Sequence, residues 1–146
     1  MATNYLIDTG VIFAMVVKED ENRDAGLRFA TEIRQGSIKP IVTDYIVDEL
    51  LTLVLNKKGI KIARIVRDFI KSRHFKIHQI NQSEFDETLA LFFHYNSKKG
   101  NISFTDCSNC VVSRELEIKY IASFDSDHDV FHNVGIHRIG DPSWVN

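Results

Sequence analysis

The sequence has few cysteines and no long apolar run, and each scarcity excludes a class of protein. Only Cys107 and Cys110 occur among its 146 residues, too few for a secreted disulfide scaffold. No stretch reaches the roughly 18 apolar residues of a membrane-spanning helix. The N-terminus also lacks the basic and apolar regions of a signal peptide. We therefore predict a protein of the cytoplasm with no membrane contact.

Net charge is small as well. Lys and Arg number 18 against 20 Asp and Glu, a formal charge of -2, so overall charge indicates no polyelectrolyte partner, although local clusters still can. Hydrophobic residues make up 44% and charged residues 26%, as in ordinary globular proteins. The length predicts one domain over residues 1–146.

The two cysteines have the spacing of a redox or zinc motif, and His128 and His132 follow them. The gap from cysteine to histidine is longer than in zinc fingers and has to cross a whole strand. Both cysteines also fit an apolar helix. We interpret them as small buried residues rather than as ligands.

Apolar patterns predict strands that alternate with helices. The predicted strands are Tyr5–Ile7, Pro40–Thr43, Phe75–Ile80, Lys119–Phe124 and, at the sheet edge, His137–Ile139. The predicted helices are Val11–Val17, Glu21–Gln35, Tyr45–Asn56, Ile60–Arg73, Ser83–Tyr95 and Thr105–Glu117. This alternation favours an α/β fold with a parallel sheet between two helical layers.

Two helix starts carry capping signals. Thr43 or Asp44 is expected to cap the helix that begins near Tyr45. Ser83 and Asp86 have the spacing of a capping box.

Carboxylates recur where the predicted elements begin or end. The four positions are Asp8 after the first strand, Glu49 in the helix after the second, Asp106 at a helix start and Asp125 after the fourth strand. Ligand sites of open α/β sheets lie at the carboxyl ends of strands, so these side chains are expected to meet. Each also has a structural alternative: Asp8 as a helix cap, Asp106 as a first-turn acid, Asp125 as a turn residue.

Glu49 has apolar neighbours at helical spacing, Ile46 and Leu53 among them. A partly buried carboxylate needs compensation, either from a metal ion or from a buried Arg or Lys. Several carboxylates at one sheet edge also repel one another without a counter-ion. Hard oxygen ligands suit Mg²⁺ or Mn²⁺, and such a site supports phosphodiester hydrolysis.

A basic segment runs from Lys57 to Lys76 and holds eight of the 18 basic residues, opposed only by Asp68. Four of them are predicted to fall near one helical face and are called the basic surface: Lys57, Lys61, Arg64 and Lys71. This face is either simply solvated or contacts the phosphates of RNA.

Four short motifs follow one another in a family-specific order: Ile7–Val11, Val47–Leu50, Ser103–Cys107 and Ala122–Asp127. Together they resemble the PIN domain, and most of all its small VapC-type ribonucleases, from Tyr5 to about Ile139. The resemblance implies a three-layer α/β/α sandwich with a central, mostly parallel sheet. It also implies an RNA-cleaving enzyme dependent on Mg²⁺ or Mn²⁺, which acts as a toxin held by a cognate antitoxin and forms homodimers.

For the site, the resemblance implies the acidic quartet Asp8, Glu49, Asp106 and Asp125. The phenylalanine expected soon after the fourth acid is displaced to Phe131, so Asp127 is a rival or a helper of Asp125. Gly10 stands where the family often has a polar residue, a role that Thr9, Thr105 or Ser123 could take. Two alternatives stay open: a PIN-like module that binds or processes RNA without being a toxin, and a receiver-like signalling module that binds Mg²⁺.

Overall fold

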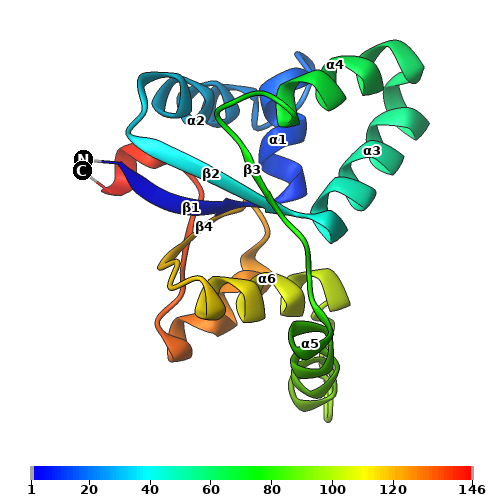
Figure 1. Ribbon diagram of the computed structural model, residues 1–146, viewed down its shortest axis with the longest axis vertical. Coiled ribbons are helices and arrows are strands. Elements are labelled where there is room, and N and C mark those ends of the chain that lie inside the picture. Colours follow the sequence, from blue (N-terminus) through cyan, green and yellow to red (C-terminus); the bar gives the residue numbers. More distant parts are fainter. Residues whose placement is uncertain (1, 146) are drawn as a thin grey trace.

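The computed structural model describes residues 2–145 and contains a five-stranded sheet between two helical layers (Figure 1). The strands are β1 (Thr3–Ile7), β2 (Ile38–Thr43), β3 (Lys76–His78), β4 (Tyr120–Ala122) and β5 (His137–Ile139). They lie in the order β3-β2-β1-β4-β5, and every pairing is parallel. The predicted α/β sandwich is confirmed.

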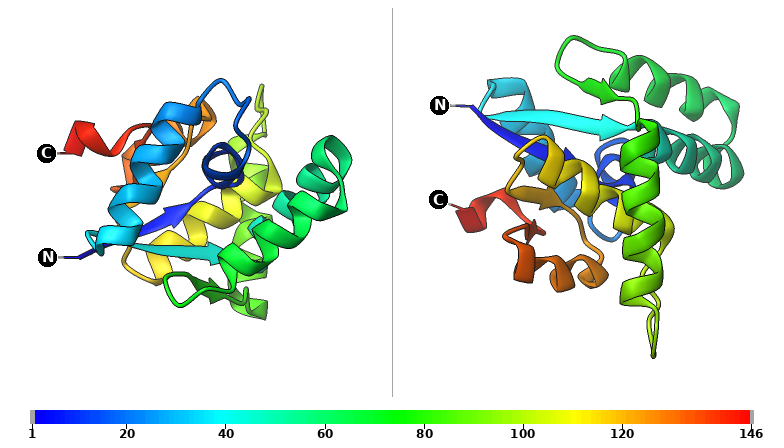
Figure 2. Two further views of the ribbon diagram at one scale, coloured as in Figure 1. Left: turned by 90° about the horizontal axis from the view of Figure 1, so that it is seen from above. Right: turned by 60° about the horizontal axis from the view of Figure 1, so that its bottom comes forward.

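One helical layer contains α1 (Thr9–Val16), α2 (Arg23–Gln35), α3 (Asp44–Lys58) and α4 (Ile60–Ile70). The other contains α5 (Gln82–Tyr95), α6 (Phe104–Glu115) and the 3-10 segment η1 (Ser126–Val134) (Figures 1 and 2). A second 3-10 segment, η2 (Pro142–Val145), follows β5. Within residues 2–145 no helix combines the length and apolarity needed to cross a membrane.

Strand β1 lies in the middle of the sheet, and helices cover both of its faces (Figure 1). Tyr5, Leu6 and Ile7 are all buried, as expected of a strand with helices on both sides. From β1 the chain moves outward to β2 and β3, then returns to β4 on the opposite side of β1. The boundary between β1 and β4 is therefore the topological switch point, where open α/β sheets place their ligand sites.

Caps define the helix starts. Thr43 caps α3, since its Oγ1 accepts a hydrogen bond from the backbone N–H of Ile46 at 3.1 Å. The predicted capping box at Ser83 is wrong: Asn81 and Glu84 form it, two residues earlier. Serine and asparagine both suit the N-cap position of a helix. Which of the two caps α5 depends on where the chain leaves β3.

Gly59 separates α3 from α4. Its φ of 86° lies in the region that favours glycine, which explains why one long basic stretch forms two helices. Helix α4 ends at Ile70, earlier than predicted. Both cysteines are free and buried in α6, and burial raises the pKa of Cys107 to about 11. A neutral buried thiol agrees with the structural interpretation of this motif.

Candidate functional site

Asp8 follows the last residue of β1 at the switch point. It occupies the N-cap position of α1, but its side chain makes no capping hydrogen bond. Instead Ser123 Oγ donates to its Oδ2 at 3.0 Å, and Asn109 Nδ2 donates to its Oδ1 at 3.4 Å. The cap interpretation is therefore wrong. Ser123 reaches Asp8 because Ile7 pairs with Ala122 in the parallel register.

Asp106 lies in the first turn of α6, where Ser103 caps the helix by accepting from the backbone N–H of Asp106. Its carboxyl group is buried, and this burial is the main cause that raises its pKa to about 6. The charges of Asp8 and Asp125 raise the pKa further, while His128 lowers it. A first-turn acid at a helix surface would not be desolvated in this way. Its burial next to other acids indicates a site.

Asp125 and Asp127 both approach Asp106. One carboxylate oxygen of each of the three lies within 4.8 Å of the others. Asp125 also has the turn role that was its alternative, because its Oδ1 accepts from the backbone N–H of Asp127 at 2.9 Å. The structure therefore brings both rivals for the fourth acid to the same place.

Glu49 is exposed, contrary to the predicted partial burial. Ile46, Leu50 and Val54 form the fully buried face of α3, and the glutamate lies beside that face rather than on it. Its side chain lines an open cavity of about 440 Å³ together with Asp8 and Asp125. The argument that a buried carboxylate needs a metal ion therefore does not apply to Glu49. Its membership of the site rests on its place at the same cavity as Asp8 and Asp125.

A second cavity, of about 530 Å³, adjoins the first along α3. The two share Glu49 and Leu53, and Thr105, the neighbour of Asp106, lines the second. The two cavities therefore form a continuous depression beside α3 that Asp8, Glu49 and Asp125 line.

His128 was missed as a member of the site. Its side chain is fully buried, and its Nε2 lies 3.3 Å from Asp106 Oδ1. In the sequence it was weighed only as a zinc ligand with the cysteines. Its position three residues after Asp125, in the same short segment, was the available signal.

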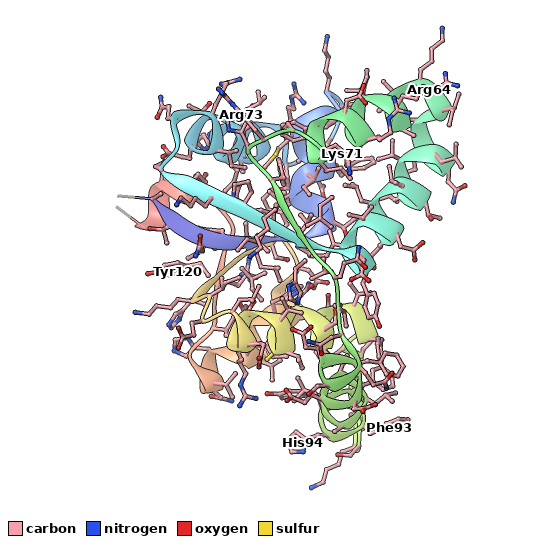
Figure 3. All side chains as sticks on the ribbon, viewed as in Figure 1. Arg64, Lys71, Arg73, Phe93, His94 and Tyr120 are labelled. Carbon is pink, nitrogen blue, oxygen red and sulfur yellow. The ribbon has the colours of Figure 1, made fainter. Side chains whose placement is uncertain are left out.

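The basic surface is divided between two helices. The prediction of a single helical face is wrong, because Lys57 belongs to α3 while Lys61 and Arg64 belong to α4. Lys57 lines the cavity that contains Asp8, and its Nζ lies 5.8 Å from the centroid of the Phe13 ring. Figure 3 shows Arg64 and Lys71 beside α4, in the layer opposite to α5 and α6.

The residues present fit a divalent cation. Two groups of side chains have ligand atoms within 4.8 Å of one another: Asp8, Asp106 and His128, and Asp106, Asp125 and Asp127. Carboxylate oxygens are the ligands that Mg²⁺ and Mn²⁺ prefer. Within residues 2–145, Thr9 Oγ1 and Asn109 Oδ1 are buried beside this cluster without a hydrogen-bond partner. An uncompensated cluster with unsatisfied oxygens is compatible with a bound ion.

An α/β fold with clustered acids at the switch point defines the class of protein, and the family model agrees with it. The PIN domain model matches residues 5–135. The chain therefore belongs to the PIN domain family, and the receiver-like alternative is wrong. No curated protein matches the sequence.

Solved structures of similar fold include VapC proteins. VapC20 of Mycobacterium tuberculosis, a sarcin–ricin loop cleaving toxin, has a TM-score of 0.79 and 16% identity, over 92% of this chain and 98% of its own. VapBC2 of Rickettsia felis, bound to a DNA fragment from its promoter, has a TM-score of 0.69 and 12% identity, over 93% of this chain and 98% of its own. FitAcB of Neisseria gonorrhoeae has a TM-score of 0.64 and 12% identity, over 93% of this chain and 96% of its own. At these identities the likeness establishes the PIN-like fold.

Proposed function

We propose that this chain is an endoribonuclease that depends on Mg²⁺ or Mn²⁺ and serves as the toxin of a type II toxin–antitoxin pair. One observation carries the proposal. Asp8, Asp106 and Asp125 come from three separate elements and meet at the switch point of the sheet, with Glu49 at the same cavity. Membership of the PIN domain family and the fold of VapC20, itself a sarcin–ricin loop cleaving toxin, support it.

In this proposal Asp8 and Asp106 are the principal ligands, and Asp125 or Asp127 completes the set. A bound ion would polarise the phosphoryl group and lower the pKa of the attacking water. Glu49, exposed at the cavity, orients that water and accepts its proton. Lys57 lines the same cavity and offsets the charge of the phosphate that enters.

The test is a cleavage assay with the purified chain. Single-stranded and structured RNA should be cut with Mn²⁺ or Mg²⁺ and stay intact with EDTA. Cleavage that persists in EDTA would overturn the metal-dependent mechanism. Co-expression with the product of the neighbouring open reading frame tests the toxin role, because a cognate antitoxin should bind the chain and suppress cleavage.

The basic surface is predicted to position RNA through its phosphates. Replacing Lys61, Arg64 and Lys71 together with Ala should weaken binding to all RNA sequences alike, since phosphate contacts carry no sequence information. The slope of log affinity against log salt should flatten by up to about 0.7 per lost contact on single strands. Filter binding over a salt series measures both quantities.

The matched control removes the same charge elsewhere, by replacing the exposed Lys98, Lys99 and Lys119 with Ala. The control should keep the slope of the wild type. Equal slopes for the two triple variants would assign the basic surface to a simply solvated face.

A homodimer is also proposed, and α5 supplies an apolar stripe for it. Phe85, Leu89 and Phe93 recur at helical spacing and are 36%, 38% and 68% exposed; Figure 3 shows Phe93 at the end of α5 remote from the sheet. Phe93→Glu should convert a dimer to a monomer in sedimentation velocity, because a charge would be desolvated in the interface. Leu27→Glu, an equally apolar exposed position on α2, should leave the dimer intact. A wild-type monomer would contradict the prediction.

A further inference from the structure

We propose that His128 is a positioning residue of the metal site, which holds the carboxylates of Asp106 and Asp8 at the spacing that an ion requires. The inference rests on the proposed metal-dependent function and adds a part to it that lies outside the acidic quartet. Three observations carry it: where the imidazole lies, what holds its Nδ1, and what meets its Nε2.

The imidazole lies behind the carboxylates rather than in the cleft. Its side chain has no exposed surface, and its ring packs against Phe131 with centroids 5.8 Å apart. Asp8 and Asp125 line the cavity, while His128 is not among its lining residues within the described chain. An ion that enters from the cavity therefore meets Asp8 and Asp125 first, whereas the ring lies deeper, against Asp106.

Nδ1 connects the ring to Asp8 through Ser123. It lies 3.2 Å from Ser123 Oγ and 3.3 Å from the carbonyl oxygen of Asp125. Ser123 Oγ donates its own proton to Asp8 Oδ2 at 3.0 Å, so toward the ring it can only accept. Both neighbours of Nδ1 are acceptors, and Nδ1 therefore carries a hydrogen and donates it. This contact sets the orientation of the ring and of the serine hydroxyl.

Nε2 completes the connection on the other side. It lies 3.3 Å from Asp106 Oδ1 and 3.2 Å from Asn109 Nδ2, and Asn109 Nδ2 also donates to Asp8 Oδ1 at 3.4 Å. Nε2 carries either a hydrogen or a lone pair, so at any one time it donates to Asp106 or accepts from Asn109, and both partners lie within reach of it. The side chains of His128, Asn109 and Ser123 thus connect the carboxyl groups of Asp8 and Asp106, which would otherwise repel each other.

Outer partners of this kind orient metal ligands, and their loss typically weakens metal affinity or activity by about 10- to 100-fold. His128→Phe keeps an aromatic ring against Phe131 and removes both nitrogens. We expect it to weaken Mn²⁺ binding at least tenfold, measured by the EPR signal of free Mn²⁺ in a titration. His128→Gln, which retains one polar end, should recover part of the affinity. His132→Phe makes the same change at an exposed histidine of η1 and should bind Mn²⁺ like the wild type.

Circular dichroism and melting in EDTA show whether each variant is folded, so that lost affinity is not mistaken for lost structure. If His128→Phe does not fold, Ser123→Ala carries the same test, because it cuts the link between the ring and Asp8 with a small change. Wild-type Mn²⁺ binding that is unaltered in a folded His128→Phe or Ser123→Ala variant overturns this inference alone. Absence of Mn²⁺ binding in the wild type overturns the proposed function and this inference with it.

Pulsed EPR of the wild type provides a test that needs no variant. A positioning role predicts no nitrogen bound directly to Mn²⁺, in protein labelled with ¹⁵N at histidine. A strong coupling to labelled histidine nitrogen would make the ring a ligand and overturn the positioning role.

Discussion

Asp8→Asn and Asp106→Asn are each expected to abolish RNA cleavage, with rates lower by roughly a thousandfold or more. The amide keeps the shape of the side chain but removes the negative charge that holds a cation. Both positions are buried at the switch point, and within residues 2–145 neither pairs with a Lys or Arg that would take over the role of an ion; their side chains contact Ser123, Asn109 and His128. Cleavage of a labelled RNA in Mn²⁺ under single-turnover conditions measures the loss.

Asp86→Asn serves as the control, because this exposed acid lies on α5 and, among the described residues, its side chain bonds to Gln82 alone. It should cleave RNA at the wild-type rate. Comparing Asp125→Asn with Asp127→Asn identifies the fourth acid, which should show the larger loss. Near-normal cleavage by either Asp8→Asn or Asp106→Asn would end the assignment of the acidic quartet.

The second large effect is on stability, where Asp106→Asn should melt higher than the wild type in EDTA at pH 7. Burial raises the folded pKa of Asp106 to about 6, above an unfolded value of about 3.9. A raised folded pKa means that the carboxyl group favours the fold below about pH 4 and loses that benefit as the pH climbs through about 6. At pH 7 the ionised group therefore destabilises the metal-free protein, by about 1 to 3 kcal/mol.

Removing that charge should raise the melting temperature by a few degrees up to about ten. In the wild type, Mn²⁺ at about a hundred times its dissociation constant should add roughly 2.7 kcal/mol by mass action, and the variant should respond less. Melting curves at pH 5 and pH 7, with EDTA and with Mn²⁺, test all of this. In EDTA the contribution of Asp106 should make the wild type gain stability at pH 5, whereas the advantage of the variant should shrink there.

Two results would contradict this account. A wild type that does not shift with Mn²⁺ would mean that the acids share no metal site. An Asp106→Asn variant that melts lower in EDTA would mean that the hydrogen bonds of the carboxylate outweigh its desolvation, and Asp106 would then be a structural residue.

The main features of the fold were readable from the sequence because they depend on local patterns. Tyr5–Ile7 is apolar on both faces, which indicates a strand with helices on either side, and the alternation of such runs with helical periods predicts parallel pairing. Asp8 and Asp125 were predicted to meet for the same reason, since each directly follows a predicted strand and parallel strands bring their carboxyl ends to one edge. The order β3-β2-β1-β4-β5 was not among the predictions and came from the tertiary structure.

What surrounds each acid was decided by contacts between residues distant in the sequence. Glu49 was expected to be partly buried, but whether a flank of α3 meets another element or a cavity depends on where α6 begins and β1 ends. Asp8 is held by Asn109 and Ser123, which are 101 and 115 residues away, and the burial that raises the pKa of Asp106 comes from the same convergence. His128 shows the limit most clearly. Its closeness to Asp125 in the sequence was the one local signal. Its place beside Asp106 and Asp8 depends on tertiary packing, because no local pattern records which side chains meet across a sheet.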